Sequence, residues 1–255
     1  MIKLCTSKII KNEKITANIF DMTIEMPGIV DNAKAGQFIN LYTDISNLLL
    51  PRPISICSID KSEGTIRIVY QKVGKGTEYF SSLQPGENIK VMGALGNGFN
   101  IPETKGIHIV IGGGMGTPPL IELVKSLQGE ILVFLGFRTG SILADEFIEM
   151  GAKVYIATED GSKGFTGNVI ELIKHINPKV DFVYSCGSAT MLCHVSKWAE
   201  EKEVKAQISM EARMGCGFGA CVGCTVKVKK AKSTDWENQR VCKDGPVFLS
   251  DEVMW

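Results

Sequence analysis

Short apolar runs separated by turn residues fill the first hundred positions of the chain. Within residues 65–71, Ile66, Ile68 and Tyr70 alternate with Arg67 in a largely period-two pattern, which is typical of a half-buried β-strand. Pro, Gly, Asn and Asp separate the runs, as they do in antiparallel barrels and sandwiches. The runs lie at residues 15–20, 37–42, 65–71 and 88–92. This spacing is that of an antiparallel barrel or sandwich, and we take a β-barrel domain over residues 1–101 as the expected fold.

The pattern changes after Pro102 to apolar strands that are each followed by helical periodicity. Four such alternations predict a parallel sheet with helices on both faces. The strands are expected at residues 107–111, 130–137, 153–158 and 181–185, and the helices at residues 119–128, 143–150, 166–176 and 190–202. A last strand at residues 206–210 leads into a cysteine-rich tail. We place this α/β nucleotide-binding domain at residues 102–209 and the tail at residues 210–255.

Length and charge narrow the functional classes. The 255 residues suffice for two domains and a small additional segment. Lys plus Arg and Asp plus Glu number 28 each, so no net field would attract nucleic acid or an anionic membrane. No secretory signal pattern opens the sequence, and no apolar stretch approaches about 18 residues. We expect a cytoplasmic protein without nucleic-acid or membrane partners.

The cysteines fall into two groups. Four are scattered, at Cys5, Cys57, Cys186 and Cys193, and are expected to be small core residues. The other four form the pattern Cys216-x4-Cys221-x2-Cys224-x17-Cys242. A reducing compartment disfavours disulfides, so the second group indicates metal or redox chemistry.

Three close ligands and one distant ligand are the plant-type ferredoxin ordering, which predicts a [2Fe–2S] cluster. Glycines interleave with the cysteines and let the loop wrap closely with its N–H groups toward the sulfur atoms. A structural zinc site is the main alternative, although zinc ribbons usually pair two C-x2-C knuckles and this tail has one. Unligated thiols or disulfides are a further alternative.

The linker before Cys242 is lysine-rich, and we expect a solvated hairpin there, with a partner-facing basic patch as the alternative. Its lysines are Lys227, Lys229, Lys230 and Lys232.

A glycine run follows the first strand of the α/β domain and precedes a helix. Such a turn lets a nucleotide pyrophosphate approach backbone N–H groups and the helix dipole. The run consists of Gly112, Gly113, Gly114, Met115 and Gly116. Cys186 and Gly187 end the fourth strand at the same edge of the sheet. Together they favour a nicotinamide nucleotide site, and a tight turn without a ligand is the alternative.

Two weaker motifs lie in the barrel domain. In Arg52-Pro53-Ile54-Ser55, a fixed guanidinium suits a diphosphate and the Ser55 hydroxyl can reach the edge of a heterocycle. Gly74-Lys75-Gly76-Thr77 is expected to form a second loop with amide, ammonium and hydroxyl donors. Each motif is short, and an ordinary turn explains the second equally well.

The order of these motifs along nearly the whole chain resembles the ferredoxin reductase superfamily and, within it, the electron-transfer subunits of NAD-dependent B-type dihydroorotate dehydrogenases. The tail is the most specific part, from Met210-Glu211-Ala212-Arg213-Met214-Gly215-Cys216 through Cys242-Lys243-Asp244-Gly245-Pro246. One departure is Cys-Gly-Ser at residues 186–188, where much of the superfamily has Cys-Gly-Pro.

The resemblance implies FAD, a [2Fe–2S] cluster and NAD as cofactors. It implies FAD contacts from Arg52, Pro53, Ile54, Ser55, Val69, Tyr70, Gln71, Gly76 and Thr77. The residues implied to border the NAD site are Gly112, Gly113, Gly114, Met115, Gly116, Cys186 and Gly187. The implied partner is an FMN-containing catalytic subunit that oxidises dihydroorotate in pyrimidine (UMP) biosynthesis, with two copies of each chain in the complex.

Electrons would then pass through the cluster and FAD to NAD+. No acid–base residue is assigned, and His108, His175 and His194 are expected to be structural. Two alternative functions are an NAD(P)H-dependent ferredoxin- or sulfide-type oxidoreductase subunit with the same cofactors, and a zinc-stabilised nucleotide-binding regulatory module.

Overall fold

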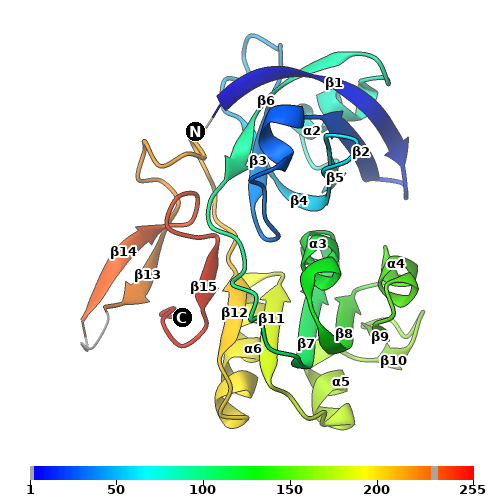
Figure 1. Ribbon diagram of the computed structural model, residues 1–255, viewed down its shortest axis with the longest axis vertical. Helices are drawn as coiled ribbons and strands as arrows, with labels where there is room; N and C mark the ends of the chain where they lie inside the picture. The colour runs from blue at the N-terminus through cyan, green and yellow to red at the C-terminus, as the bar shows by residue number, and fades with distance from the viewer. Residues whose placement is uncertain (1–2, 231–234) are drawn as a thin grey trace.

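Six antiparallel strands close into a barrel in the N-terminal part of the chain, at the top of Figure 1. This computed structural model describes residues 3–230 and 235–255. The barrel order is β1-β2-β5-β4-β3-β6, which confirms the predicted barrel. Its elements are β1 (Lys3–Lys14), β2 (Ile19–Glu25), α1 (Pro27–Val30), β3 (Phe38–Tyr42), β4 (Arg52–Asp60), β5 (Thr65–Gln71), α2 (Lys75–Ser82) and β6 (Asn88–Leu95).

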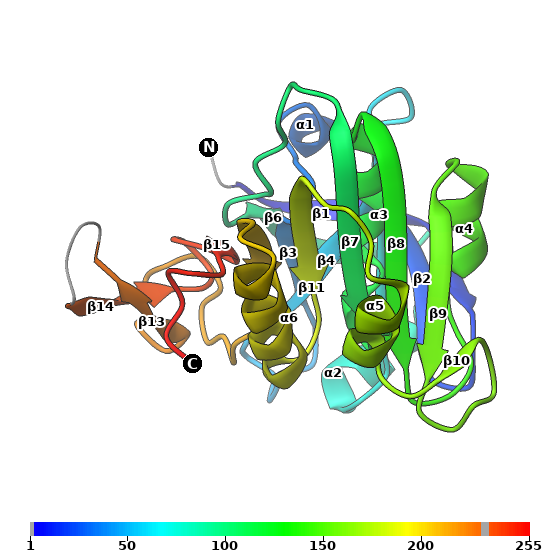
Figure 2. The same cartoon turned by 90° about the horizontal axis from the view of Figure 1, so that it is seen from below.

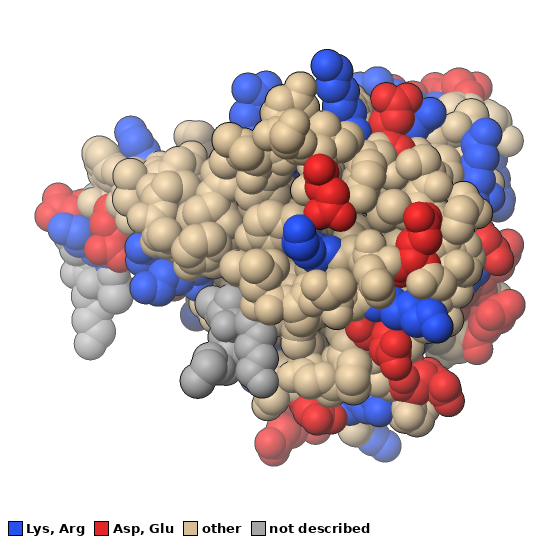
Figure 3. Space-filling model, turned by 90° about the horizontal axis from the view of Figure 1, so that it is seen from above, with Lys and Arg blue, Asp and Glu red and all other residues tan. Residues whose placement is uncertain are grey.

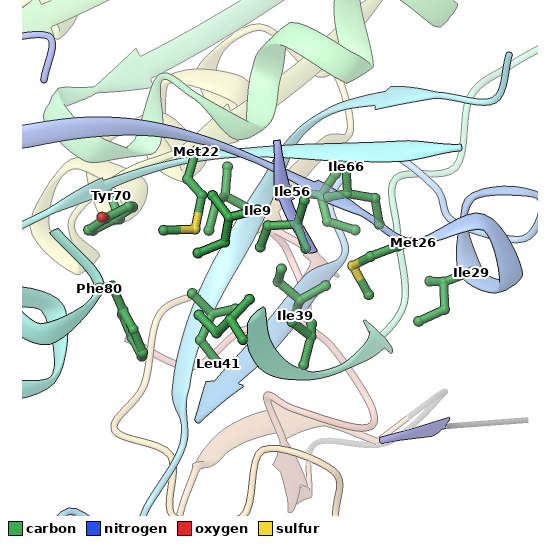
Figure 4. Packing of buried hydrophobic residues seen from close by; sticks show 14 of the residues in the cluster. Ile9, Met22, Met26, Ile29, Ile39, Leu41, Ile56, Ile66, Tyr70 and Phe80 are labelled. Atoms are coloured by element: carbon green, nitrogen blue, oxygen red, sulfur yellow. The ribbon is translucent and has the colours of Figure 1, made fainter. Parts of the chain in front are cut away.

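The barrel is filled by side chains from alternate positions of its strands (Figure 4). Ile66, Ile68 and Tyr70 of β5 are all buried, as the period-two pattern predicts. Phe80 of α2 packs edge-on against Tyr70, with ring centroids 6.4 Å apart, and closes one end of this core. The barrel therefore has an apolar core of its own.

The second part is a seven-stranded sheet with the order β10-β9-β8-β7-β11-β12-β15. Helices α3 and α4 pack on one face and α5 and α6 on the other, and Figure 2 shows the latter pair over the near side of the sheet. Its elements are β7 (Gly106–Gly113), the 3-10 turn η1 (Gly114–Gly116), α3 (Pro119–Ser126), β8 (Gly129–Phe137), α4 (Ala144–Glu149), β9 (Lys153–Thr158), β10 (Phe165–Thr166), α5 (Val169–Ile176), β11 (Phe182–Cys186), α6 (Ala189–Glu201) and β12 (Ala206–Ser209). The predicted alternation of strands and helices is thus confirmed.

The tail forms a hairpin of β13 (Thr225–Lys229) and β14 (Trp236–Arg240), and then returns to the main sheet as β15 (Val247–Leu249). The expected hairpin is confirmed, and Lys232 lies outside the described residues. We predicted a parallel sheet, but β15 pairs antiparallel with β12, so the sheet is mixed. The tail is consequently joined to the α/β domain by backbone hydrogen bonds.

Two local predictions in the barrel are wrong. Residues 15–20 are not one strand, because β1 ends at Lys14, a turn follows, and β2 starts at Ile19. Residues 74–77 are not simply a loop, because Gly74 is the N-cap of α2 and the helix begins at Lys75. The N–H groups at the start of α2 therefore have no partners within the helix and are available to a ligand.

None of the helices within residues 3–230 and 235–255 has the length and hydropathy needed to span a membrane. On the face in Figure 3, Lys and Arg are interspersed with Asp and Glu. This distribution agrees with the balanced charge of the sequence.

Candidate functional site

Arg52 and Gly76 meet where β4 approaches the N-terminus of α2. A Cβ atom on Gly76 would lie 2.5 Å from Nε of Arg52, so the guanidinium lies directly against the helix and would have to shift if position 76 carried a side chain. Nη1 of Arg52 also donates a hydrogen bond to the Leu50 carbonyl. A guanidinium beside the first turn of a helix offers two kinds of donor to a diphosphate. The geometry suits the predicted FAD diphosphate.

The side chains of Thr77 and Tyr70 serve the barrel instead. Oγ1 of Thr77 accepts hydrogen bonds from the N–H groups of Val73 (2.9 Å) and Gly74 (3.2 Å), and so shapes the start of α2. The Tyr70 hydroxyl donates to Oδ1 of Asn12 over 3.1 Å, and its ring is 1% exposed. The Tyr70 ring is therefore packed mainly in the barrel core, at the border of the cleft described next.

Residues from all three parts of the chain line one cleft of about 480 Å³. The predicted FAD residues in its wall are Pro53, Ile54, Ser55, Val69, Tyr70 and Gln71. The predicted nucleotide residues there are Gly113, Met115, Gly116, Cys186 and Gly187. The start of the tail adds Met210, Glu211, Ala212 and Met214, which the sequence did not single out as binding residues. Motifs more than a hundred residues apart thus share one cavity.

Two loops of the α/β domain touch at the point where the strand order reverses. β7 lies in the middle of the sheet, the chain continues outward to β8 and β9, and it then returns to β11 on the other side of β7. Open α/β sheets bind ligands at such a switch point. A Cβ atom on Gly116 would lie 2.2 Å from the Cys186 carbonyl oxygen, so the two predicted nucleotide loops are in direct contact. Gly112 lies deeper, packed under Thr117 and Leu120 at the start of α3.

Burial raises the pKa of the Cys186 thiol to about 12. The thiol is therefore protonated near neutral pH and carries no charge into the cleft. Cys186 can contribute packing and an S–H group there, and no thiolate.

A second crevice of about 660 Å³ continues from Gly113 and Gly114 across the carboxyl ends of β8 and β9. Most of the residues that line this crevice were not among the predicted site residues. The additional residues include Phe137, Arg138, Glu159, Asn168, Lys174, Met191 and His194. Phe137 ends β8 and Glu159 follows β9, so their position after predicted strands was an available signal. His194, which we expected to be structural, is exposed at this crevice.

The four tail cysteines form two neighbouring pairs. The Cys221 N–H group points at Sγ of Cys216 over 3.3 Å, and the Cys242 N–H group points at Sγ of Cys224 over 3.5 Å. Cys224 and Cys242 are buried, whereas Cys221 is exposed. Among the described residues, no three potential ligands converge on one metal position. Pairs of thiols match a cluster of two irons, each taking two cysteines, better than a single tetrahedral zinc.

Backbone donors give the exposed pair the electrostatics that a cluster needs. Burial acts to raise the pKa of the Cys216 thiol, but N–H groups of Cys221, Phe218 and Ala220 outweigh it and lower this pKa to about 6. In the inner pair, burial and then the neighbouring Cys224 thiol raise the pKa of Cys242 to about 12. The loop around Cys216 therefore stabilises negative charge on sulfur, which is what a thiolate-bound cluster presents.

The segment that follows β6 and leads to the α/β domain makes hydrogen bonds and packing contacts with the tail after Cys242. The Asn97 N–H group donates to the Gly245 carbonyl over 2.6 Å, and Nδ2 of Asn97 donates to the Asp244 carbonyl over 3.0 Å. Gly96 has a φ of +72° and lies against Pro246, where a Cβ atom would be 2.6 Å from the proline ring. The backbone after Cys242 is thereby fixed against the end of β6.

Comparison with known proteins gives consistent matches for these parts. A family model described as an oxidoreductase FAD-binding domain matches residues 6–99. A model described as the iron–sulfur cluster binding domain of dihydroorotate dehydrogenase B matches residues 211–254, which include all four tail cysteines. The electron transfer subunit of dihydroorotate dehydrogenase B (NAD(+)) from Streptococcus pneumoniae is 38% identical, with 100% of each chain covered.

The chain belongs to the family of dihydroorotate dehydrogenase B electron transfer subunits.

The member of this family from Desulforamulus reducens is 39% identical, again over 100% of each chain. Among solved structures, an NADH-dependent reduced ferredoxin–NADP oxidoreductase studied for flavin-based electron bifurcation has a TM-score of 0.87 at 29% identity, covering 98% of this chain and 90% of that chain. A ferredoxin reductase of carbazole 1,9a-dioxygenase has a TM-score of 0.66 at 19% identity, covering 80% of this chain and 67% of that chain, and shares the fold. As a member of the dihydroorotate dehydrogenase B family, the chain has an FAD-binding barrel, a nucleotide-binding sheet and an iron–sulfur tail, as predicted.

Proposed function

We propose that this chain passes electrons from a dihydroorotate-oxidising flavoprotein subunit, through a [2Fe–2S] cluster and FAD, to NAD+ in pyrimidine biosynthesis. The observation that carries the proposal is the cleft shared by the barrel, the glycine turn and the start of the tail. When bound, FAD exchanges a hydride with the nicotinamide and single electrons with the cluster. One cleft can hold the flavin between the other two carriers.

In this proposal the chain's residues bind and orient the cofactors. Arg52 and the first turn of α2 hold the FAD diphosphate, and residues 53–55 and 69–71 border the flavin. Residues 112–116 and 186–187 hold the nicotinamide nucleotide at the switch point of the sheet. The cluster is held by Cys216 with Cys221 and by Cys224 with Cys242. The proposed limits are residues 1–101 for the FAD-binding barrel, 102–209 for the nucleotide-binding domain and 210–255 for the cluster-binding tail.

The partner we propose is an FMN-containing catalytic subunit, with two copies of each chain in the complex. The test is reconstitution of the two purified subunits, followed by an assay of dihydroorotate-dependent NAD+ reduction. The expected result is NADH formation only when both subunits are present. NADH formation by the catalytic subunit alone, or none by the complex, would contradict the proposal.

The structural likeness to a reduced ferredoxin–NADP oxidoreductase favours one second candidate, a ferredoxin-linked reductase subunit with the same cofactors. Reduced ferredoxin offered in place of dihydroorotate and its subunit separates the two. Iron and acid-labile sulfide analysis addresses the zinc-stabilised regulatory module, which would contain zinc and neither of these.

The ligand assignment is tested by Cys221→Ser, which changes the exposed member of the outer pair. We expect loss of the visible absorption and paramagnetic signal of the cluster, with reduction of FAD by NADH retained. Cys5→Ser in β1 is the control, because this partly buried thiol lies in the barrel and should leave both signals intact. An unchanged cluster spectrum in Cys221→Ser would refute the assignment.

A further inference from the structure

Asn40 is a fully buried polar side chain at the contact between the barrel and the cysteine tail. It lies in β3 and is 0% exposed. Its Nδ2 donates a hydrogen bond to the carbonyl oxygen of Cys216 over 3.0 Å. A barrel residue thus binds the backbone of a proposed cluster ligand 176 positions further along the chain.

Asn40 also lies beside β4, the strand that borders the proposed flavin site. In the ladder between β3 and β4, Asn40 is the register partner of Pro53. Pro53 lines the shared cleft beside Ile54 and Ser55. Pro53, Asn40 and Cys216 therefore form an unbroken series of contacts from the flavin cleft to the cluster loop.

The tail is shaped to accept this amide. Gly217, next to Cys216, has a φ of +72°, and a Cβ atom there would lie 2.4 Å from Nδ2 of Asn40. A side chain at position 217 would push the loop away from the barrel. The close approach depends on glycine for both its conformation and its size.

Stability alone does not explain an asparagine here. Within the described residues, Oδ1 of Asn40 is buried and has no hydrogen-bond partner. A buried acceptor without a partner costs stability. A leucine would remove that cost but would also leave the Cys216 carbonyl without this donor, so the contribution of the amide at this contact is its hydrogen bond to the tail.

We propose that Asn40 is a positioning residue that holds the Cys216 backbone against the flavin strand and so sets the separation between the flavin and the cluster. This inference rests on the proposed function. In the direction of the proposed function, the reduced cluster loses one electron and FAD gains it, and the NADH-driven test below runs the same transfer in reverse. Asn40 forms and breaks no bond, and its hydrogen bond to the ligand's backbone also tunes the charge that the cluster can hold.

Asn40→Leu removes the hydrogen bond at similar volume, and it is tested in the full chain loaded with FAD and cluster. Anaerobic mixing with NADH is followed at flavin and cluster wavelengths, and the reduced cluster is examined by paramagnetic resonance. We expect flavin reduction at the wild-type rate, cluster reduction slowed roughly 10–100-fold, and a changed cluster spectrum, as is typical when a group supporting a metal ligand is lost.

Asn12→Leu is the matched control. Asn12 is another barrel asparagine whose Nδ2 donates to backbone carbonyls, those of Phe80 and Leu83, each over 2.8 Å. This variant should leave the rate of cluster reduction and the cluster spectrum unchanged. If Asn40→Leu fails to fold, Asn40→Asp keeps the shape, removes the N–H donor and places a negative charge beside Cys216, and it should show the same slowing.

Cluster reduction at the wild-type rate with an unchanged spectrum in a folded Asn40 variant would overturn the inference. Equal slowing in Asn12→Leu would overturn it as well, because any barrel damage would then suffice. The wild-type chain is measured first. If NADH does not reduce its cluster, the proposed function fails, independently of any result for the Asn40 variants.

Discussion

The barrel and the cysteine tail bury their apolar side chains in different ways. The buried residues of the barrel core lie between Ile9 and Val91, and all residues packed against them belong to the barrel domain. The core under the tail combines Phe38 of the barrel and Ile208 of the α/β domain with Cys224 and Cys242 of the tail itself. A segment of this size buries too little surface to fold alone. The place of the cluster relative to the flavin is therefore determined by the two larger domains.

The largest effect should come from removing one phenylalanine from each core. Phe248 of β15 is 6% exposed in the shared core, and Phe80 of α2 is 0% exposed in the barrel core. Each change to Ala should lower the free energy of unfolding by about 3–5 kcal/mol. In Phe248→Ala we expect cluster absorbance to disappear at a lower urea concentration than bound flavin. In Phe80→Ala the flavin should be released first.

Both signals are recorded in one urea titration of each variant. If flavin and cluster signals fall together in both variants, the two cores are not separable and the comparison is wrong.

A charged contact between the barrel and the α/β domain gives the second prediction. Arg67 of β5 donates to Glu146 of α4 through Nη1 (2.6 Å) and Nη2 (2.8 Å), and through Nε to Asp21 of β2 (2.9 Å). These hydrogen bonds, that with Glu146 foremost, raise the pKa of Arg67. Arg67→Ala leaves the 7% exposed Asp21 carboxylate without this partner and should cost about 3 kcal/mol, at the lower end for a buried pair because Arg67 is partly exposed.

Thermal unfolding measures this loss, and the rate of FAD reduction by NADH should fall because the two domains are less firmly held. The control is Glu130→Gln, which removes an exposed pair with Lys153 at 2.7 Å and should cost at most about 1 kcal/mol. If Arg67→Ala and Glu130→Gln lower the stability by the same amount, the contact between the domains contributes no more than an exposed ion pair.

A change in the nucleotide site shows whether damage to the α/β domain also affects the flavin and the cluster. A methyl group on Gly116 would collide with the Cys186 carbonyl, so Gly116→Ala should cost about 2 kcal/mol through displaced backbone. We expect NADH affinity to fall roughly tenfold or more, with flavin and cluster spectra unchanged. Titration with NADH under anaerobic conditions measures the affinity. Gly28→Ala is the control, because no atom lies within 4 Å of its added Cβ.

Unchanged NADH affinity in Gly116→Ala would remove residues 112–116 from the nucleotide site. Loss of the cluster in this variant would instead show that the α/β domain and the tail are coupled more tightly than the separate cores indicate.

Motifs whose chemistry is local could be predicted from the sequence. The glycine turn after the first strand of the α/β domain and the iron–sulfur tail could be recognised from residue order and spacing, whereas the roles of the individual residues stay predictions. β15 was missed because its pairing with β12 joins segments about forty positions apart, and such a pairing leaves no periodicity in three residues. Glu159 and Phe137 were missed because a strand end becomes a binding position only when several strands lie side by side.

Tyr70 shows what strand periodicity alone can predict. Its alternation with Ile66 and Ile68 already placed the ring on the core side of β5, and the structure agrees. The resemblance nevertheless implied a flavin contact for this residue. Strand periodicity predicts the direction of the side chain, and the flavin contact of Tyr70, which lines the shared cleft, stays a prediction.

The smallest predicted effect concerns the N-cap of α5. Oδ1 of Asn168 accepts hydrogen bonds from the N–H groups of Ile170 and Glu171, each over 3.0 Å, and the Asn168 N–H group donates to Oε2 of Glu171 over 3.0 Å. Asn168→Ala should cost about 1 kcal/mol. Because α5 packs on the face of the sheet remote from the barrel, thermal unfolding of this variant should keep the flavin and cluster transitions in their wild-type order. A cluster signal that falls alone would mean that the tail depends on the whole α/β domain and not only on the shared core around Ile208 and Phe248.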